Sequence, residues 1–379
     1  MIKIKSDKII LGEDLFDGYL YLEDGKVLEV SKNDRPCEES YDYTDLYVSP
    51  GFIDLHTHGA GGHAFMNSTP EDVVKGSLYH LRFGTTCILP TISAGAFPVM
   101  RDAVINIQKA MDSGKAPNIY GAHLEGPYLS QKQCGAQNTA FITAPVQADY
   151  ESLIAEYGSA VKRWTYAPEN DPKGAFCKFI TSHGVIASAG HSDAIYDDMQ
   201  VAMANGCNLI THLYSCTSTI TRDHGFRRLG LIETAYLEDG LYVEIIADGK
   251  HLPPELLRLI LKSKDTDKIA LITDSLEIAG TDIKEGVMSG TEFIVEDGVC
   301  KLKDRSAFAG SVATADRLIK TLVKECGVAV PTAVKMLTKV PAEILRVNKG
   351  ELTPGKDADV VVFDEDIAVK QVFLAGKQI

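Results

Sequence analysis

The chain lacks an excess of positive charge. Its 379 residues include 38 Lys and Arg against 52 Asp and Glu, for a formal net charge of −14 at pH 7. Binding of nucleic acid needs a basic surface that neutralises phosphates, so this charge argues against a nucleic acid partner. A small anionic substrate stays compatible with it, because the local charge in a cleft can oppose the charge of the whole chain.

Long apolar runs are also missing. No stretch approaches the roughly 20 residues of a membrane-spanning helix, and the opening residues MIKIK do not form the apolar block of a signal peptide. The eight cysteines are scattered, and no two form a C-x-x-C pair. In a chain of this length such cysteines are typical of reduced thiols. We therefore expect a cytoplasmic protein without disulfide bonds and without a membrane partner.

The two ends of the chain share one pattern. Residues 1–48 and 350–379 contain short alternating runs around Gly-containing turns, as in YLYL, EDGK and VLEV at 19–30. Such runs indicate antiparallel strands. Because a short β segment is not stable alone, we expect the two ends to pair with each other in one small β-sandwich domain.

Residues 49–349 have a different pattern, in which short apolar strands alternate with helical segments. The first helical segment opens with Thr69, Pro70 and Asp72, a typical helix start. Strands that alternate with helices predict parallel pairing, and eight such units in about 300 residues fit an α/β fold of the (β/α)8 TIM-barrel type. An open doubly wound sheet is the alternative, although no G-x-G-x-x-G motif follows the first strand. The expected strands are 52–55, 85–89, 119–124, 163–167, 185–189, 208–212, 242–246 and 268–273. A hairpin is expected at 291–302, beside the barrel or on the small domain.

Polar residues follow these strands at their C-terminal ends. The loops after barrel strands meet at one face, so residues far apart in sequence come together there. The residues concerned are His56 and His58 after the first strand, Glu125 after the third, His191 after the fifth, His212 after the sixth, Asp248 and His251 after the seventh, and Asp274 after the eighth.

Each of these residues also has an ordinary structural interpretation. A His-x-His pair such as His56 and His58 points two imidazoles to one face of a strand, where they can share a cation. A carboxylate such as Glu125 at the end of a buried strand needs either a salt bridge or a metal. His191 and His212, taken singly, fit hydrogen-bonded core histidines. Their positions on adjacent strand ends favour a metal site.

This set of residues suits metal-assisted hydrolysis. A divalent metal lowers the pKa of bound water from about 15.7 toward about 7. Histidine and carboxylate ligands suit Zn²⁺ and also Fe²⁺, and we expect Zn²⁺, as one or two ions. Asp274 is the candidate to take the proton of the water and to pass it to a leaving amine. Strand four ends without a lysine, in RWTYAPE at 163–169, so a carbamylated lysine is not expected and Glu125 has to supply the carboxylate ligand.

The motifs resemble those of the amidohydrolase superfamily and, more narrowly, of N-acetylglucosamine-6-phosphate deacetylases. The resemblance covers roughly residues 48–360, and its pieces occur in the order of that family. They are PGFIDLHTH at 50–58, GAHLEGPY at 121–128, GHS at 190–192, THLY at 211–214, IADGKH at 246–251, ITD at 272–274 and AGS at 309–311.

The resemblance implies a fold, a set of ligands and an activity. Glu125, His191 and His212 would hold the principal metal, while His56 and His58 fit the members that bind a second one. The expected substrate is a small amino-sugar phosphate, with N-acetylglucosamine 6-phosphate hydrolysed to glucosamine 6-phosphate and acetate.

The resemblance also assigns roles around the substrate. Asp274 would be the acid and base, and His251 would contact the substrate near the scissile amide. Arg227 would bind the phosphate in the site of a neighbouring subunit, which implies a homodimer. An arginine fork suits phosphate well, although an exposed arginine usually has no such role. Ala309 belongs to a further matching piece and is expected to line the substrate site.

Three loops that would contact the substrate depart from the family pattern. Gln137 stands where the family has a histidine, Ser215, Cys216 and Thr217 replace Asn-Ala-Met, and 227–230 read RRLG rather than REPG. Because the expected ligands are intact, the reaction type is better supported than the sugar. The alternatives are a hydrolase for a different N-acylated sugar or another small amide, and a non-catalytic barrel scaffold, which would have lost its ligands.

Overall fold

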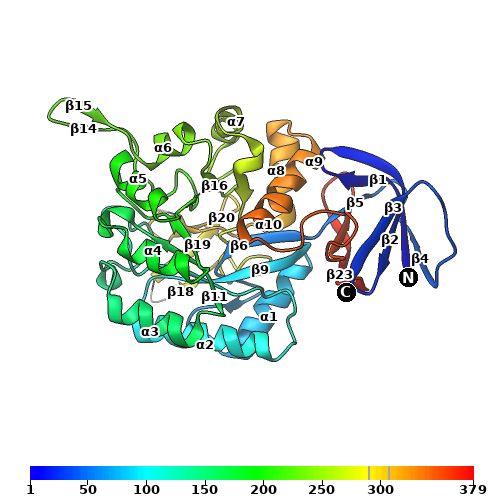
Figure 1. Cartoon of the computed structure of the whole chain (residues 1–379), viewed down its shortest axis with the longest axis horizontal. Helices are drawn as coiled ribbons and strands as arrows, with labels where there is room; N and C mark the ends of the chain where they lie inside the picture. Colours follow the sequence, from blue (N-terminus) through cyan, green and yellow to red (C-terminus); the bar gives the residue numbers. More distant parts are fainter. Residues whose placement is uncertain (289–290, 306–307) are drawn as a thin grey trace.

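The structure, a computed structural model, describes residues 1–288, 291–305 and 308–379. Figure 1 shows two parts: a barrel surrounded by helices, and a smaller group of strands that contains both chain termini. The first strand of the barrel follows directly on a strand of the small part, so the two parts are joined through adjacent residues.

The small part is built by both ends of the chain, as the sequence predicted. A single eight-stranded sheet has the order β24-β23-β22-β5-β1-β2-β3, with β4 paired to β1. Pairing between β5 and β22, with Val48 opposite Val362, joins the two ends. A register shift in β1 marks the point where its partner changes from β4 to β5. The strands are β1 Ile2–Leu11, β2 Asp14–Glu23, β3 Lys26–Ser31, β4 Glu39–Asp42, β5 Tyr47–Pro50, β22 Val360–Phe363, β23 Val369–Leu374 and β24 Lys377–Gln378. The domain limits at 48 and 350 stay predictions, and β5 crosses the first of them.

The large part is a parallel eight-stranded barrel, which confirms the predicted fold. Neighbouring strands pair in the order β17-β16-β13-β12-β11-β10-β9-β6. The first and last strands meet through a parallel bridge from Thr57 to Ser275 and through a 2.5 Å hydrogen bond from Thr273 Oγ1 to Asp54. The strands are β6 Phe52–Thr57, β9 Thr85–Ile92, β10 Ala122–Glu125, β11 Val161–Tyr166, β12 Ile186–Ala189, β13 Leu209–Ile210, β16 Tyr242–Ile245 and β17 Ile269–Leu271.

Helices surround the barrel. The first begins where the sequence predicts it: the side chain of Thr69 accepts from the backbone N–H of Asp72, and Asp72 accepts from the backbone N–H of Thr69. This capping box satisfies two of the N–H groups that a helix start leaves free. The helices are α1 Pro70–Leu81, α2 Phe97–Asp112, α3 Gln147–Tyr157, α4 Ala175–Ser182, α5 Tyr196–Ala204, α6 Leu231–Leu237, α7 Pro254–Ser263, α8 Ala315–Cys326, α9 Val330–Leu337 and α10 Lys339–Leu345. Three short 3-10 helices are Thr139–Phe141, Pro168–Asn170 and Thr266–Lys268.

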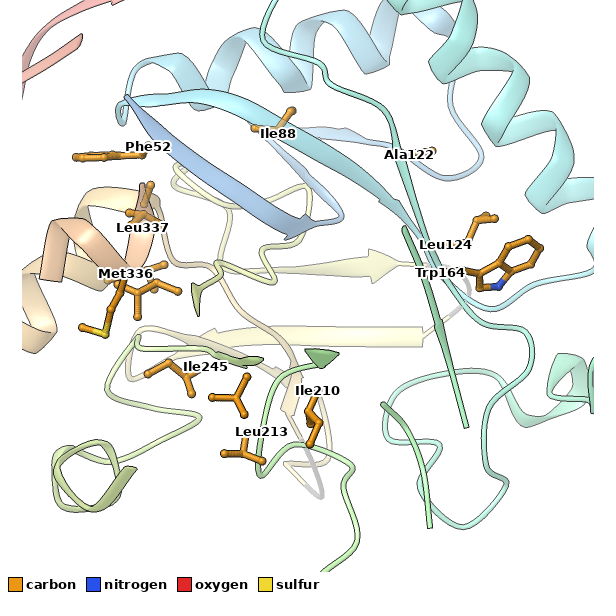
Figure 2. Packing of buried hydrophobic residues seen from close by; sticks show 14 of the residues in the cluster. Phe52, Ile88, Ala122, Leu124, Trp164, Ile210, Leu213, Ile245, Met336 and Leu337 are labelled. Carbon is orange, nitrogen blue, oxygen red and sulfur yellow. The ribbon is translucent and has the colours of Figure 1, made fainter. Parts of the chain in front are cut away.

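Successive side chains of each strand point to opposite faces of the sheet, so the barrel has two separate apolar layers. Leu124 of β10 and Trp164 of β11 are register partners, and they belong to the large buried cluster between strands and helices that Figure 2 shows. A second cluster joins strand residues such as Leu55 and Ile272 to α10 residues such as Ile344. The barrel interior is therefore closed by apolar packing at the α10 end, and polar side chains occupy its other positions.

The remaining strands form small additions to the barrel. The hairpin predicted at 291–302 is present as β19 and β20, and it packs with Leu276 and Ile278, directly after the last barrel strand, so it lies beside the barrel. A second hairpin, β14 and β15, projects from the body in Figure 1. These strands are β7 Gly59–Ala60, β8 His63–Ala64, β14 Thr221–Asp223, β15 Phe226–Arg228, β18 Glu285–Met288, β19 Thr291–Glu296, β20 Val299–Leu302 and β21 Phe308–Gly310.

In the three ranges that the structure covers, helices long and apolar enough to cross a membrane are absent. All eight cysteines are free thiols.

Candidate metal centre and active site

Five predicted metal ligands converge at the C-terminal end of the barrel. They form two overlapping groups, one with His56, His58 and Glu125 and the other with Glu125, His191 and His212. Glu125 Oε1 lies 3.1 Å from His191 Nε2 and 3.0 Å from His212 Nε2. Its Oε2 lies 3.3 Å from His58 Nε2. The carboxylate of Glu125 therefore faces both groups and can be shared between two ions.

The backbone turns sharply at two of these ligands and at the proposed acid and base residue, directly after their strands. His191, His212 and Asp274 have left-handed backbone conformations, with φ of 46°, 29° and 46°. Such conformations are uncommon outside glycine and cluster at functional sites. Each of these residues lies two or three positions after the last residue of its strand.

The donor atoms fit a bound cation. Nδ1 of His191 lies 2.9 Å from the carbonyl oxygen of Gln133, and a carbonyl only accepts hydrogen bonds, so this nitrogen carries a proton. In the neutral form that a metal ligand needs, the His191 ring would present the lone pair of Nε2 toward the carboxylate of Glu125, so one cation could bind both. The Nε2 atoms of His191 and His212 are 3.2 Å apart, close to the roughly 3.3 Å between two ligands of a tetrahedral zinc ion.

The carboxylates at this site stay ionised. Burial alone would raise the pKa of Glu125, but His56 and His191 hold it well below its usual range. Burial is likewise opposed at Asp274, where His56 and His58 lower the pKa of the carboxyl to about 2. Asp274 Oδ1 lies 3.1 Å from His58 Nε2, and its side chain is 17% exposed against 2% for Glu125. Asp274 is thus the carboxylate with access to an incoming molecule.

A buried ion pair lies beneath the ligands, and the sequence analysis missed it. Arg163 of β11 and Glu244 of β16 are fully buried and form a bidentate pair inside the barrel. Glu244 Oε2 is 3.8 Å from Nδ1 of His56. Among the described residues, no group hydrogen-bonds to that nitrogen, so Glu244 is the acid that faces it. The signal in the sequence was a charged residue at a buried position in each of two strands, VKRWTY and YVEI.

Two further polar residues of the barrel interior were not predicted as part of the site. His123 hydrogen-bonds to Thr91 through Nδ1 at 3.1 Å and to Thr165 through Nε2 at 2.7 Å, so both ring nitrogens have partners. Burial, together with Arg163, keeps the pKa of His123 well below its usual value. It is therefore a neutral structural histidine. Asp54 joins the first and last strands, and burial raises its pKa to about 6.

Gln137 lies at the site, beside the ligand Glu125. Its Nε2 donates to Glu125 Oε2 at 2.8 Å, and its Oε1 accepts from the backbone N–H of Ala94 at 2.9 Å. The prediction gave Gln137 a substrate contact. In the structure both ends of its amide contact the protein.

Ser215 and Cys216 directly follow the ligand His212. The backbone N–H of Ser215 donates to the His212 carbonyl at 2.9 Å. Cys216 has a left-handed backbone with φ of 51°, and its sulfur lies against Gly135, where an added Cβ would come within 2.5 Å of it. The absence of a side chain at Gly135 thus lets the loop that carries Gln137 approach the loop after His212.

His251 and Ala309 lie on loops and strands next to the ligands. His251 Nδ1 is 2.8 Å from Asp248 Oδ2, and its ring lies 5.0 Å from that of Phe308. Burial opposes ionisation of Asp248, but His251 lowers the pKa of its carboxyl. Ala309 is the middle residue of β21. Two residues later, the backbone N–H of Ser311 donates to the backbone carbonyl of Asp274 at 3.3 Å. These contacts place both residues beside the Asp274 end of the site.

Arg227 is not brought to the metal centre of its own chain. It lies on β15 of the projecting hairpin, is exposed, and donates to the Gly225 carbonyl at 3.2 Å. The neighbouring Phe226 is 73% exposed. An arginine on such a projection can reach a site only outside its own barrel.

Comparisons with known proteins agree with this site. The model of the amidohydrolase family matches residues 47–379. The N-acetylglucosamine-6-phosphate deacetylase of Bacillus subtilis (strain 168) is 30% identical over 368 residues, which cover 94% of this chain and 91% of the relative. An N-acetylgalactosamine-6-phosphate deacetylase of Shewanella sp. (strain ANA-3) is 30% identical over 339 residues, 89% of this chain and 84% of the relative. The crystal structure of N-acetylglucosamine-6-phosphate deacetylase from Pasteurella multocida has a TM-score of 0.92 and 28% identity, and covers 100% of this chain and 99% of that chain. The chain therefore belongs to the amidohydrolase family, hydrolases of carbon–nitrogen bonds, and is related there to the deacetylases of amino-sugar 6-phosphates.

Proposed function

We propose that this protein is a metal-dependent deacetylase that removes the N-acetyl group of an amino-sugar 6-phosphate. N-acetylglucosamine 6-phosphate, hydrolysed to glucosamine 6-phosphate and acetate, is the first candidate substrate. The observation that carries the proposal is the convergence of four histidines on Glu125, with the partly exposed carboxylate of Asp274 3.1 Å from His58. A non-catalytic scaffold would have no need to keep these groups together.

The proposed cofactor is a divalent metal, with Zn²⁺ favoured and Fe²⁺ as the alternative. Glu125, His191 and His212 would hold one ion, and His56 and His58 would hold a second with Glu125 between them. Imidazole and carboxylate ligands suit both metals. When bound, the metal supplies hydroxide near neutral pH and polarises the amide carbonyl.

Asp274 is proposed to carry the proton. Its side chain is 17% exposed, and its carboxylate can accept a proton at Oδ1. The same oxygen would return the proton to the nitrogen of the leaving amine, which departs more readily as a neutral amine. His251 is proposed to contact the substrate beside the scissile amide, with its ring held by Asp248 at 2.8 Å. Ala309 and the loop with Ser215 and Cys216 would form the wall of the sugar site.

The phosphate is proposed to bind Arg227 of a second copy of the chain. The exposed position of Arg227 on the projecting hairpin supports this assignment, as does the match between a guanidinium fork and phosphate oxygens. A homodimer is part of the same proposal. A cytoplasmic location, expected from the free cysteines, is also a proposal.

A second candidate substrate is N-acetylgalactosamine 6-phosphate. It is favoured by the altered loops at Gln137 and 215–217 and by the 30% identity to a deacetylase of that sugar phosphate. The two substrates differ only in the configuration of one hydroxyl, so the same metal site would serve either of them.

The test is a panel of N-acetylated sugars with the gluco, galacto and manno configurations, each with and without the 6-phosphate. Metal-loaded protein is incubated with each sugar, and the release of acetate is measured as kcat/KM, with Asp274→Asn as the control for catalysis by this site. We expect acetate release that depends on the phosphate. Equal rates for phosphorylated and unphosphorylated sugars contradict the phosphate assignment, and no release from any of them contradicts the deacetylase assignment.

A further inference from the structure

The side chain of Gln137 is held between the protein backbone and a metal ligand. Its Oε1 accepts a hydrogen bond from the backbone N–H of Ala94 at 2.9 Å, in the loop after β9. Its Nε2 donates to Oε2 of Glu125 at 2.8 Å. The side chain is partly buried, and both of its polar atoms are used within the protein.

The orientation of this amide follows from its partners. A backbone N–H can only donate, so the oxygen of Gln137 has to face Ala94. The NH₂ group is then left facing Glu125, whose ionised carboxylate can only accept. The two partners together exclude the flipped amide, which would set donor against donor and acceptor against acceptor.

The hydrogen bond falls on one oxygen of Glu125 and not on the other. Oε1 faces His191 and His212, at 3.1 and 3.0 Å, and it also lies 3.4 Å from His56 Nε2. Oε2, which accepts from Gln137, is the oxygen that lies 3.3 Å from His58. Gln137 therefore holds the oxygen that faces His58, a ligand of the second group.

The same loop also positions a ligand of the first group. The carbonyl of Gln133, four residues before Gln137, accepts from Nδ1 of His191 at 2.9 Å. One hydrogen bond from this loop holds the carboxylate of Glu125, and another holds the ring of His191. The orientation of the shared carboxylate at both metal positions therefore depends on the conformation of this loop. Partners of this kind orient metal ligands and tune metal affinity.

We propose that Gln137 is a positioning residue that directs Glu125 Oε2 toward His58, and so toward the second metal position. This inference rests on the metal centre of the proposed function and adds to it a residue that sets the occupancy of the second ion. An uncharged donor suits the role, because it fixes the carboxylate without adding a positive charge that would repel the cation.

The test compares metal binding by Gln137→Met with that of the unaltered protein. Methionine keeps nearly the length of glutamine but makes neither hydrogen bond. Protein stripped with a chelator is titrated with Zn²⁺ by calorimetry, and the number of bound ions is counted by native mass spectrometry. We expect two ions in the unaltered protein and a dissociation constant for the weaker one that is about 10- to 100-fold larger in Gln137→Met, with a smaller change for the tighter ion.

Gln131→Met is the matched control. Gln131 lies on the same loop and donates its amide to the carbonyls of Thr139 and Ile142, at 3.0 and 3.2 Å, rather than to a metal ligand. The Gln131→Met variant should loosen the loop without changing the ratio of the dissociation constants of the two metal ions. Thermal melts followed by circular dichroism establish that each variant is folded, and Gln137→Ala replaces Gln137→Met if the latter is not.

Two results overturn the inference. One is unchanged binding of both ions in Gln137→Met, and the other is an unaltered protein that binds no second ion. Since these titrations contain no sugar, a failure of the acetate-release panel leaves their outcome intact, and the two proposals can fail separately.

Discussion

Glu244→Gln tests whether the interior of the barrel depends on the buried pair beneath the metal centre. Arg163 has five N–H groups, and all five have acceptors. Two bind Glu244, and the others bind Ser188 Oγ, Thr211 Oγ1 and the Leu55 carbonyl, at 3.0, 2.8 and 3.1 Å. Arg163 and Glu244 are both 0% exposed, so water is not available to replace a lost partner.

The expected loss of stability is large for a change of a single atom. Glutamine keeps the shape of Glu244 but removes its charge, and it turns an NH₂ group toward a guanidinium that only donates. Removing one partner of a buried pair leaves an uncompensated charge and costs about 3–5 kcal/mol. An exposed pair, such as that of Arg258 with Glu255, contributes only about 0–1 kcal/mol. Glu255→Gln is therefore the control.

The double variant Arg163→Met/Glu244→Leu should recover most of the loss. It buries no charge, and replacing a buried pair by apolar groups of similar volume is often close to neutral. Thr165 Oγ1 still hydrogen-bonds to Ser188 and to Thr211, at 2.8 and 3.0 Å, when the guanidinium is gone. Ser188 Oγ and Thr211 Oγ1 lose the guanidinium but keep Thr165 as a partner, whereas the Leu55 carbonyl loses its side-chain donor.

The assay is urea unfolding of chelator-treated protein, so that loss of metal does not contribute to the difference. The unaltered protein, Arg163→Met, Glu244→Leu and the double variant Arg163→Met/Glu244→Leu form a double-mutant cycle. A Glu244→Gln variant within about 1 kcal/mol of the unaltered protein would refute the reasoning, because it would mean that the buried charge is compensated by another group.

Three further predictions concern the site itself. His191→Ala and His212→Ala should each lose bound metal together with activity, because each removes one of three ligands of the first group; full metal content by elemental analysis in both would refute this assignment. Asp274→Asn keeps the side-chain shape without the proton acceptor, so kcat should fall about 10²- to 10⁴-fold while the metal held by His191 and His212 largely stays, and near-normal turnover would contradict the acid and base role. If Asp274 also ligates a second ion, one equivalent of metal is lost in that variant. Arg227→Ala should raise KM for a phosphorylated sugar and leave the rate with an unphosphorylated one unchanged; equal effects on both sugars would remove Arg227 from phosphate binding.

Features that depend on neighbouring residues could be predicted from the sequence. The helix start at Thr69 and Asp72 is local, because the cap and its partner are three residues apart. The His-x-His pair is local for the same reason, since the period of an extended strand directs His56 and His58 to one side. The barrel was predictable as well, because the alternation of apolar strands and helices leaves few ways to bury both faces of a parallel sheet.

The sequence predicted the presence of each strand more accurately than the residue at which the strand ends. The sixth strand was expected at 208–212, but its regular pairing covers only Leu209–Ile210. The left-handed backbone of His212 turns the chain out of the sheet. An apolar pattern reports which residues are buried, and it does not report where the backbone leaves the extended conformation.

Contacts between distant segments were decided by the tertiary structure alone. Arg163 and Glu244 are 81 residues apart, and nothing near either of them indicates that the other lies opposite inside the barrel. Gln137 was assigned to the substrate because its neighbours resemble a substrate loop, whereas its amide meets Glu125 and Ala94. The sequence by itself determined the strands, the helices and the residue types at the strand ends, because these follow from local periodicity and burial. Only closure of the barrel decided which polar groups face one another, because the direction of a hydrogen bond depends on the position of both partners in space.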